Sequence, residues 1–95
     1  MLHFSWDVIK NRTNRRKHGV SFEEAQTVFN DPNARVISDP DHSATEDRFV
    51  LLGLSERLRL LVVCHCDREA DSLIRIIAAR KATRKETKMY EVHFP

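Results

Sequence analysis

Alternating apolar and polar positions, separated by turn residues, divide this chain into short strands and helices. Phe4 and Trp6 alternate with polar neighbours and predict a short opening strand. Further strands are predicted at residues 34–38, 48–54, 58–65 and 73–80. The last three are separated by short polar turns, which is typical of an antiparallel meander.

Two helices are predicted before the main strands. The first begins after Asp7, whose side chain can cap it, and ends near His18, with Gly19 in a left-handed conformation. The second begins at Ser21, and Glu24 stands where it can complete a capping box by reaching back to the serine. Apolar residues at helical spacing then give this second helix one buried face.

A third helix is predicted at the end of the chain, because Thr83 and Glu86 repeat the capping-box pattern. Together the elements predict a single α+β domain over residues 1–95. We expect a twisted antiparallel sheet of about four strands, two N-terminal helices and one C-terminal helix, with the helices packed on one sheet face.

The distribution of charge is more informative than the net charge of +2. Residues 10–17 carry five Lys and Arg and no acid, and residues 80–88 carry five against one acid. The rest of the chain therefore holds six basic and thirteen acidic residues. Two basic stretches of the same sign indicate an anionic partner, most often a nucleic acid, although solvated helix faces would explain each stretch separately.

Several arginines lie inside predicted strands, where a charge is unusual. The alternation of side chains along a strand puts Arg75 on the same side as Ala79 and puts Arg80 on the other side. Arg48, Arg59 and Arg75 suggest a hydrated, positively charged sheet face. The alternative is that each is an ordinary exposed residue of a half-covered sheet.

Metal chemistry is not favoured by the positions of the histidines and cysteines. In Cys64-His65-Cys66 the two thiols lie on one side of a strand and the imidazole on the other, so one ion cannot use all three. Asp39, Asp41 and His42 share one loop, but nothing fixes their geometry. We expect no metal and no cofactor.

Other classes are excluded by composition. The longest apolar runs are a few residues, far short of the roughly 20 that a membrane span needs. With two glycines in the chain, a glycine-rich phosphate loop is excluded. The N-terminus lacks the pattern of a signal peptide, and two cysteines in one strand are a poor disulfide pair, so we expect a reducing cytoplasm.

A cluster of cations with a few titratable neighbours remains, and this set suits metal-independent cleavage of RNA. RNA supplies its own nucleophile, the 2′-hydroxyl, so a protein needs only to align it, remove a proton and stabilise charge. Arginine can bind the phosphate through two hydrogen bonds. The cluster comprises Lys17, His18, Arg48, Arg75, Arg80, Lys81, Glu86 and Tyr90.

The sequence also resembles the BrnT family of bacterial toxins. The matching N-terminal segment is Lys-His-Gly-Val-Ser-Phe-Glu-Glu-Ala at residues 17–25, preceded by Asn14. The matching C-terminal segment is Ile-Arg-Ile-Ile-Ala-Ala-Arg-Lys-Ala-Thr at residues 74–83, closed by Glu86 and Tyr90. The family usually has Ser where this chain has Ala78.

The resemblance implies a ribonuclease toxin of a type II toxin–antitoxin system, with a RelE-like fold, that stops translation by cutting RNA. It implies a BrnA-like antitoxin with a ribbon-helix-helix domain, a 2:2 heterotetramer, and contact with operator DNA through the antitoxin. The implied catalytic residues are Arg48, Arg75, Arg80, Glu86 and His18. The implied ligands of RNA phosphates are Lys17, Lys81, Arg84 and Tyr90. The implied acid–base candidates are Glu86, Tyr90 and His18.

Two other functions stay open. The chain could be an inactive module that binds RNA or the antitoxin, a reading that Ala78 favours. It could also be a co-repressor whose basic residues contact operator phosphates, which would add affinity without sequence recognition.

Overall fold

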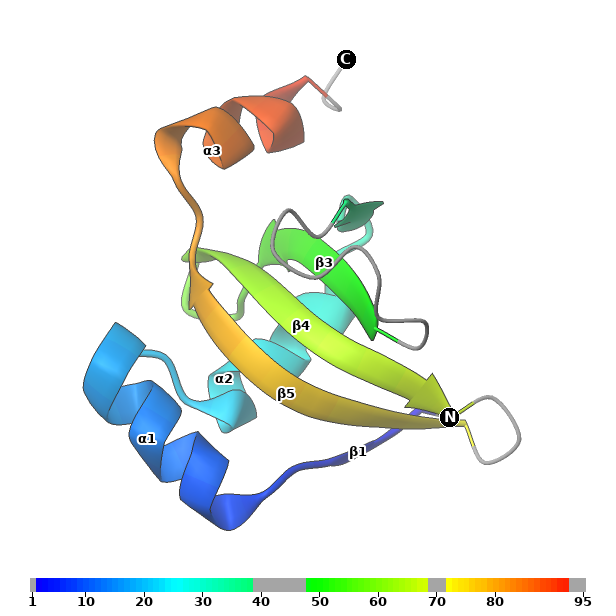
Figure 1. The fold of residues 1–95 in the computed structure, drawn as a ribbon. Coiled ribbons are helices and arrows are strands. Elements are labelled where there is room, and N and C mark those ends of the chain that lie inside the picture. Colours follow the sequence, from blue (N-terminus) through cyan, green and yellow to red (C-terminus); the bar gives the residue numbers. More distant parts are fainter. Residues whose placement is uncertain (1, 39–47, 69–71, 93–95) are drawn as a thin grey trace.

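The computed structural model describes residues 2–38, 48–68 and 72–92. Within these ranges, five strands, three α-helices and one short 3-10 helix follow one another (Figure 1). In chain order they are β1 (His3–Ser5), α1 (Val8–His18), α2 (Phe22–Thr27), η1 (Val28–Asn30), β2 (Arg35–Ile37), β3 (Arg48–Leu54), β4 (Leu60–Arg68), β5 (Leu73–Lys81) and α3 (Arg84–Glu91).

The strands form one mixed sheet of five, in the order β1-β5-β4-β3-β2. The expected α+β class with three helices is confirmed, but the sheet has five strands in place of about four, and it is mixed and not purely antiparallel. The extra pairing joins the first strand to the last, since β1 runs parallel to β5 with Phe4 opposite Ile74. No local turn connects these strands, so the pairing depends on tertiary packing: Phe4 packs against the same core cluster that α2 covers.

Helices cover both faces of the sheet, and not one face as the sequence suggested. On one face, Phe22 and Ala25 of α2 pack with Leu51 and Val63 in the larger core cluster. We call this the α2 face. On the other face, which we call the α3 face, residues of α3 that include Tyr90 pack with a second cluster. That second cluster contains Val50, Leu52 and Val62, with Met89 at its margin.

Helix α1 lies beside the edge of β5 (Figure 1) and not on the core. Val8 and Ile9, the apolar residues of this helix, are 66% and 64% exposed, so α1 has no buried apolar face. The buried residue of α1 is Asn14. Its side-chain amide accepts from the backbone N–H of Ala79 at 3.2 Å and donates to the carbonyl of Ala79 at 2.7 Å. Asn14 also donates to the carbonyl of Val20, so one amide takes the place of a neighbouring strand.

The turn between β3 and β4 is longer than the three residues predicted. Strand β4 begins at Leu60, because Leu58 has a left-handed backbone with φ 62°. The turn is closed by Ser55, whose carbonyl accepts from the N–H of Leu58 and whose hydroxyl accepts from the N–H groups of Arg57 and Arg59.

The two predicted capping boxes have different outcomes. The box at the start of α3 is confirmed, since Thr83 and Glu86 each bond the other's backbone N–H. At the start of α2, Ser21 caps the helix, but Glu24 does not reach back. Its carboxylate instead accepts from the Ser55 hydroxyl at 2.7 Å and from the guanidinium of Arg59. These bonds fasten α2 to the β3–β4 turn.

Helix α3 is held to the sheet through Asp31, which follows η1. The Tyr90 hydroxyl donates to Asp31 Oδ2 at 2.6 Å, and the same oxygen accepts from the backbone N–H of Leu54 at 2.8 Å. The chain passes very close to Gly53 here, since a Cβ on Gly53 would lie 2.7 Å from Val28 Cγ1 and 2.8 Å from the Cβ of Ala34.

Candidate functional site

A β-bulge in β5 decides which side chains share a face of the sheet. Cys64 of β4 pairs with Ala78 of β5, but the next residue, His65, pairs with Ile76. Ile77 is therefore the extra residue on β5. One extra residue reverses the alternation of all side chains on one side of it relative to those on the other.

Because of the bulge, Arg75 and Arg80 lie on the same face, and the prediction from simple alternation was wrong. Arg75 pairs with Cys66 and Arg80 with Val62, and these two positions of β4 share the α3 face. Arg48 of β3 is the other partner of Cys66. The α3 face therefore carries Arg48, Arg75 and Arg80, with Arg48 and Arg75 two strands apart, roughly 10 Å between their Cα atoms. Arg35 of β2 also lies on this face, paired with Leu52, but its guanidinium donates to the carbonyl of Met89 in α3 at 3.0 Å.

Arg59 does not belong to this group. Its guanidinium donates to the carboxylate of Glu24 and, at 3.0 Å, to the carbonyl of Gly19, so it lies with α2 on the opposite face. The bonds from Arg59 lower the pKa of Glu24 despite burial, with a smaller contribution from Ser55. Arg59 has a structural role, and the expected positive sheet face holds Arg48 and Arg75 without it.

Arg80 and Glu86 form a bidentate pair where β5 leads into α3. Arg80 donates to the two carboxylate oxygens of Glu86 at 2.7 and 2.9 Å. Glu86 also accepts from the backbone N–H of Thr83 at 2.9 Å. The hydrogen bonds from Arg80, followed by that from Thr83, lower the pKa of Glu86 to about 2 against the opposing effect of burial. Glu86 is therefore a carboxylate that stays ionised and orients Arg80.

Tyr90 is 6% exposed, and its hydroxyl donates a hydrogen bond to Asp31. Burial, followed by the bond to Asp31, raises the pKa of Tyr90 to about 12. The predicted site residue Tyr90 therefore lies within the contact that holds α3.

Lys17 and His18 lie in the last turn of α1, which faces β5. They line a pocket of about 280 Å³ between α1 and the strand, together with Ile77 and Ala78. The structure thus brings these two predicted site residues to the strand that carries Arg75 and Arg80. Sequence reasoning missed Ile9 and Thr13, which also line this pocket. The signal that could have identified Ile9 was its presence as an apolar residue in a basic helix that has no buried apolar face.

The remaining predicted cations, Lys81 and Arg84, are exposed near the junction of β5 and α3. Figure 1 shows α1 beside β5 and α3 beyond its end, so both basic stretches of the sequence lie around this strand. The exposed basic residues on α1 are Lys10, Arg12, Arg15, Arg16 and Lys17. The exposed basic residues in or next to α3 are Lys81, Arg84, Lys85 and Lys88.

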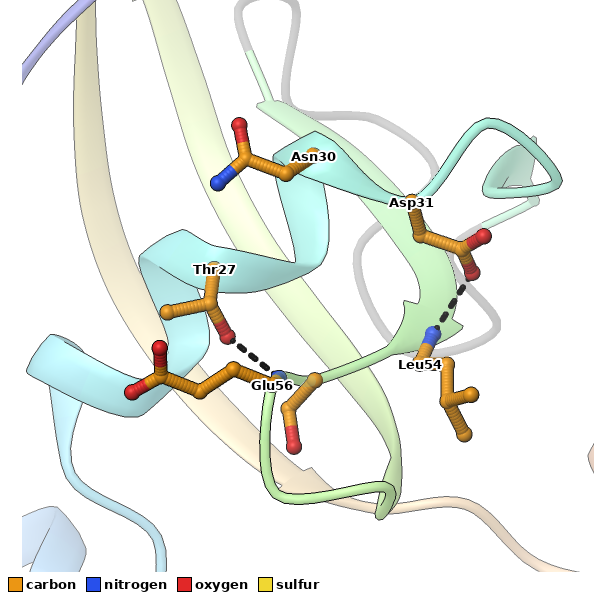
Figure 2. A pocket seen from close by; sticks show the side chains of 6 residues that line it. Thr27, Asn30, Asp31, Leu54 and Glu56 are labelled. Atoms are coloured by element: carbon orange, nitrogen blue, oxygen red, sulfur yellow. Dashed lines mark hydrogen bonds between the residues drawn. The ribbon is translucent and has the colours of Figure 1, made fainter.

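A pocket of about 220 Å³ between η1 and the β3–β4 turn has the opposite character (Figure 2). The Thr27 hydroxyl accepts from the Glu56 backbone N–H at 2.9 Å, and Asp31 bonds Leu54 on the other side. Its lining includes two acids, Asp31 and Glu56, and no Lys or Arg. This pocket does not suit an anionic polymer.

Cys64 and Cys66 lie on the α3 face, and His65 lies on the α2 face against Phe29. Among residues 2–38, 48–68 and 72–92, no group of three His, Cys, Asp or Glu side chains could hold a metal ion. The loop with Asp39, Asp41 and His42 lies outside the described residues. No helix in the described ranges is long and apolar enough to cross a membrane.

Comparisons with known proteins add a family and a related fold. Residues 6–86 match a family model described as "Ribonuclease toxin, BrnT, of type II toxin-antitoxin system". The crystal structure of the Brucella abortus ribonuclease toxin BrnT is similar, with a TM-score of 0.67 and 22% sequence identity. The alignment covers 88% of this chain and 100% of the Brucella chain. The comparison with curated proteins found no match.

Proposed function

Because the chain belongs to the BrnT family of ribonuclease toxins of type II toxin–antitoxin systems, we propose that it is a metal-independent endoribonuclease that inhibits translation by cutting RNA. The observation that carries this proposal is the common face shared by Arg48, Arg75 and Arg80. Fixed cations on one face can bind a phosphate and stabilise the extra negative charge of the transition state.

The proposed reaction uses the RNA's own 2′-oxygen. This oxygen loses its proton to a general base and attacks the adjacent phosphorus, while the bond from phosphorus to the 5′-oxygen breaks and that oxygen gains a proton. The products end in a 2′,3′-cyclic phosphate and a 5′-hydroxyl. Arg48, Arg75 and Arg80 hold the phosphate, and Lys17, Lys81 and Arg84 are proposed as further contacts to the RNA. The hydroxyl of Tyr90, the fourth contact expected from the sequence, donates to Asp31 instead.

Among the acid–base candidates Glu86, Tyr90 and His18, His18 is the favoured proton acceptor. Glu86 is a weak base at neutral pH because its pKa is about 2. The Tyr90 hydroxyl donates a hydrogen bond to Asp31, and its pKa of about 12 makes it a poor acid. His18 lines the α1–β5 pocket, and imidazole is the side chain that most often transfers protons in enzymes.

The partner belongs to the same proposal. A type II system pairs a toxin with an antitoxin, and we propose a BrnA-like ribbon-helix-helix protein, a 2:2 heterotetramer and contact with operator DNA through the antitoxin. The RelE-like class of the fold and a cytoplasmic location are likewise proposed.

The experiment compares induced expression of the native chain with that of Arg75→Ala. Arg75 is exposed, so the variant is expected to fold. Arg57→Ala is the matched control, because Arg57 is an exposed arginine of the β3–β4 turn, 3.9 Å from Glu24. Growth arrest with fragmented RNA should be lost in Arg75→Ala and kept in Arg57→Ala. In vitro, purified protein in excess chelator should cut RNA to cyclic phosphates and leave 2′-deoxy substrate intact.

A second function is favoured by one observation. Ala78 is exposed and lines the pocket with His18, where the family usually has a hydroxyl. A soluble native chain that binds RNA or an antitoxin without arresting growth would be a disabled member of the family that acts as a co-repressor.

A further inference from the structure

The pocket between α1 and β5 combines an apolar lining with a basic rim. Ile9 of α1 and Ile77 and Ala78 of β5 supply apolar surface. Lys10, Lys17 and His18 surround it, and the pocket lining holds no acid. Helix α1 (Val8–His18) contains no Asp or Glu, and the Asp7 carboxylate at its N-cap is occupied by the backbone N–H groups of Ile9 and Lys10.

The pocket is a built feature of the fold. Asn14 bonds both backbone groups of Ala79 and thereby holds α1 at a fixed distance from the strand. The bulge leaves Ile77 as an extra residue without a partner on β4, and its side chain lines the pocket. Ile9 is 64% exposed, so its place in the pocket is not required by the core.

These properties match one unstacked nucleobase of RNA. A base has two apolar faces and polar edges, and it lies between two phosphates. The pocket's volume of about 280 Å³ is slightly below the range of roughly 300–1,000 Å³ for drug-sized ligands, which suits a single base. Apolar surface can contact the faces, the Thr13 hydroxyl can bond an edge, and the lysines can hold the neighbouring phosphates.

We propose that this pocket is a nucleobase subsite that sets the sequence preference of RNA cleavage, an inference that rests on the proposed ribonuclease function. Ala78 forms part of the pocket and lies two residues from Arg80 along β5. A base bound here therefore belongs to a nucleotide next to the phosphate that the arginines hold. Since Ala78 offers a methyl group and no hydroxyl, this wall contacts a base through its face.

The test compares Ile9→Glu with Val8→Glu. Both residues lie in the first turn of α1 and are equally exposed, and both variants add the same charge, but only Ile9 lines the pocket. The probes are short 2′-O-methyl RNA oligonucleotides with one base varied at a time, which cannot be cut because the nucleophile is blocked. Ile9→Glu should weaken binding about tenfold and remove the base preference, while Val8→Glu stays within about twofold of the native chain.

Ala78→Ser serves as a second variant that leaves the charge unchanged, and it should alter which base is preferred. If Ile9→Glu and Val8→Glu bind all probes equally well and cut RNA at the native positions, the subsite is overturned while the ribonuclease function stands. A loss of antitoxin binding confined to Ile9→Glu would then assign the pocket to that partner. If the native chain neither binds nor cuts RNA, the proposed function fails and the subsite fails with it.

Discussion

The guanidinium of Arg80 and the carboxylate of Glu86 are joined by two hydrogen bonds, of 2.7 and 2.9 Å. The same carboxylate caps α3 through the backbone N–H of Thr83. One buried carboxylate therefore connects the helix cap with an arginine of the candidate site. Glu86 contributes to stability as well as to the orientation of Arg80.

We expect this pair to make the protein sensitive to acid. The pKa of Glu86 falls from 4.5 to about 2 on folding, so the unfolded chain binds more protons between these values. The free energy of unfolding should therefore fall as pH is lowered from about 4.5 to about 2, with a contribution from Glu86 of about 1–3 kcal/mol after allowance for solvent screening.

Urea unfolding of the native chain and of Glu86→Gln at about pH 6 and about pH 3 measures this contribution. Glu86→Gln should be less stable at the higher pH and should lose less on acidification. Glu91→Gln, an exposed substitution in the same helix, is the control and should follow the native chain. Equal loss of stability in the native chain and Glu86→Gln would contradict the assignment.

Asn14→Ala should destabilise the fold strongly. The substitution removes three hydrogen bonds. The N–H and C=O of Ala79 and the C=O of Val20 then lose the side-chain amide as their hydrogen-bond partner. We expect a loss of about 2–4 kcal/mol, measured by chemical denaturation. Thr13→Ala, at an exposed neighbouring position, is the control. A change of under about 0.5 kcal/mol for Asn14→Ala would show that α1 is held by other contacts.

The two glycines should respond differently to alanine. Gly53→Ala forces a Cβ to within 2.8 Å of Val28 and Ala34, and we expect overpacking to cost about 1–3 kcal/mol or more. Gly19→Ala meets no atom within 4 Å, but its φ of 70° is a left-handed conformation that costs an L-residue about 1–2 kcal/mol. Thermal unfolding compares them, and a Gly53→Ala variant as stable as the native chain would rule out the close approach.

Tyr90→Phe separates the structural role of the hydroxyl from a role in RNA contact. The hydroxyl donates a hydrogen bond to Asp31, so removing the hydroxyl should lower the free energy of unfolding by about 1–2 kcal/mol. At a temperature where the variant stays folded, kcat/KM for RNA cleavage should fall by less than about tenfold. A larger fall without loss of stability would place the hydroxyl at the substrate.

The sequence by itself determined the features that depend on neighbouring residues. The caps at Asp7 and Thr83, the left-handed Gly19 and the three main strands follow from side chains within a few positions of one another, and each is present. The family, too, was visible in the residues at 17–25 and 74–83, and the family match confirms it.

The tertiary structure decided what depends on distant partners. Glu24 bonds Arg59, 35 residues away, in place of completing its cap, and β1 joins the sheet beside the last strand. The single extra residue Ile77 brings Arg75 and Arg80 to one face, because a strand alternates with a period of two and one insertion reverses the order. Neither the choice of Glu24 between a helix cap and Arg59 nor the bulge at Ile77 leaves a pattern in the local sequence, since each is fixed by the packing of the whole sheet.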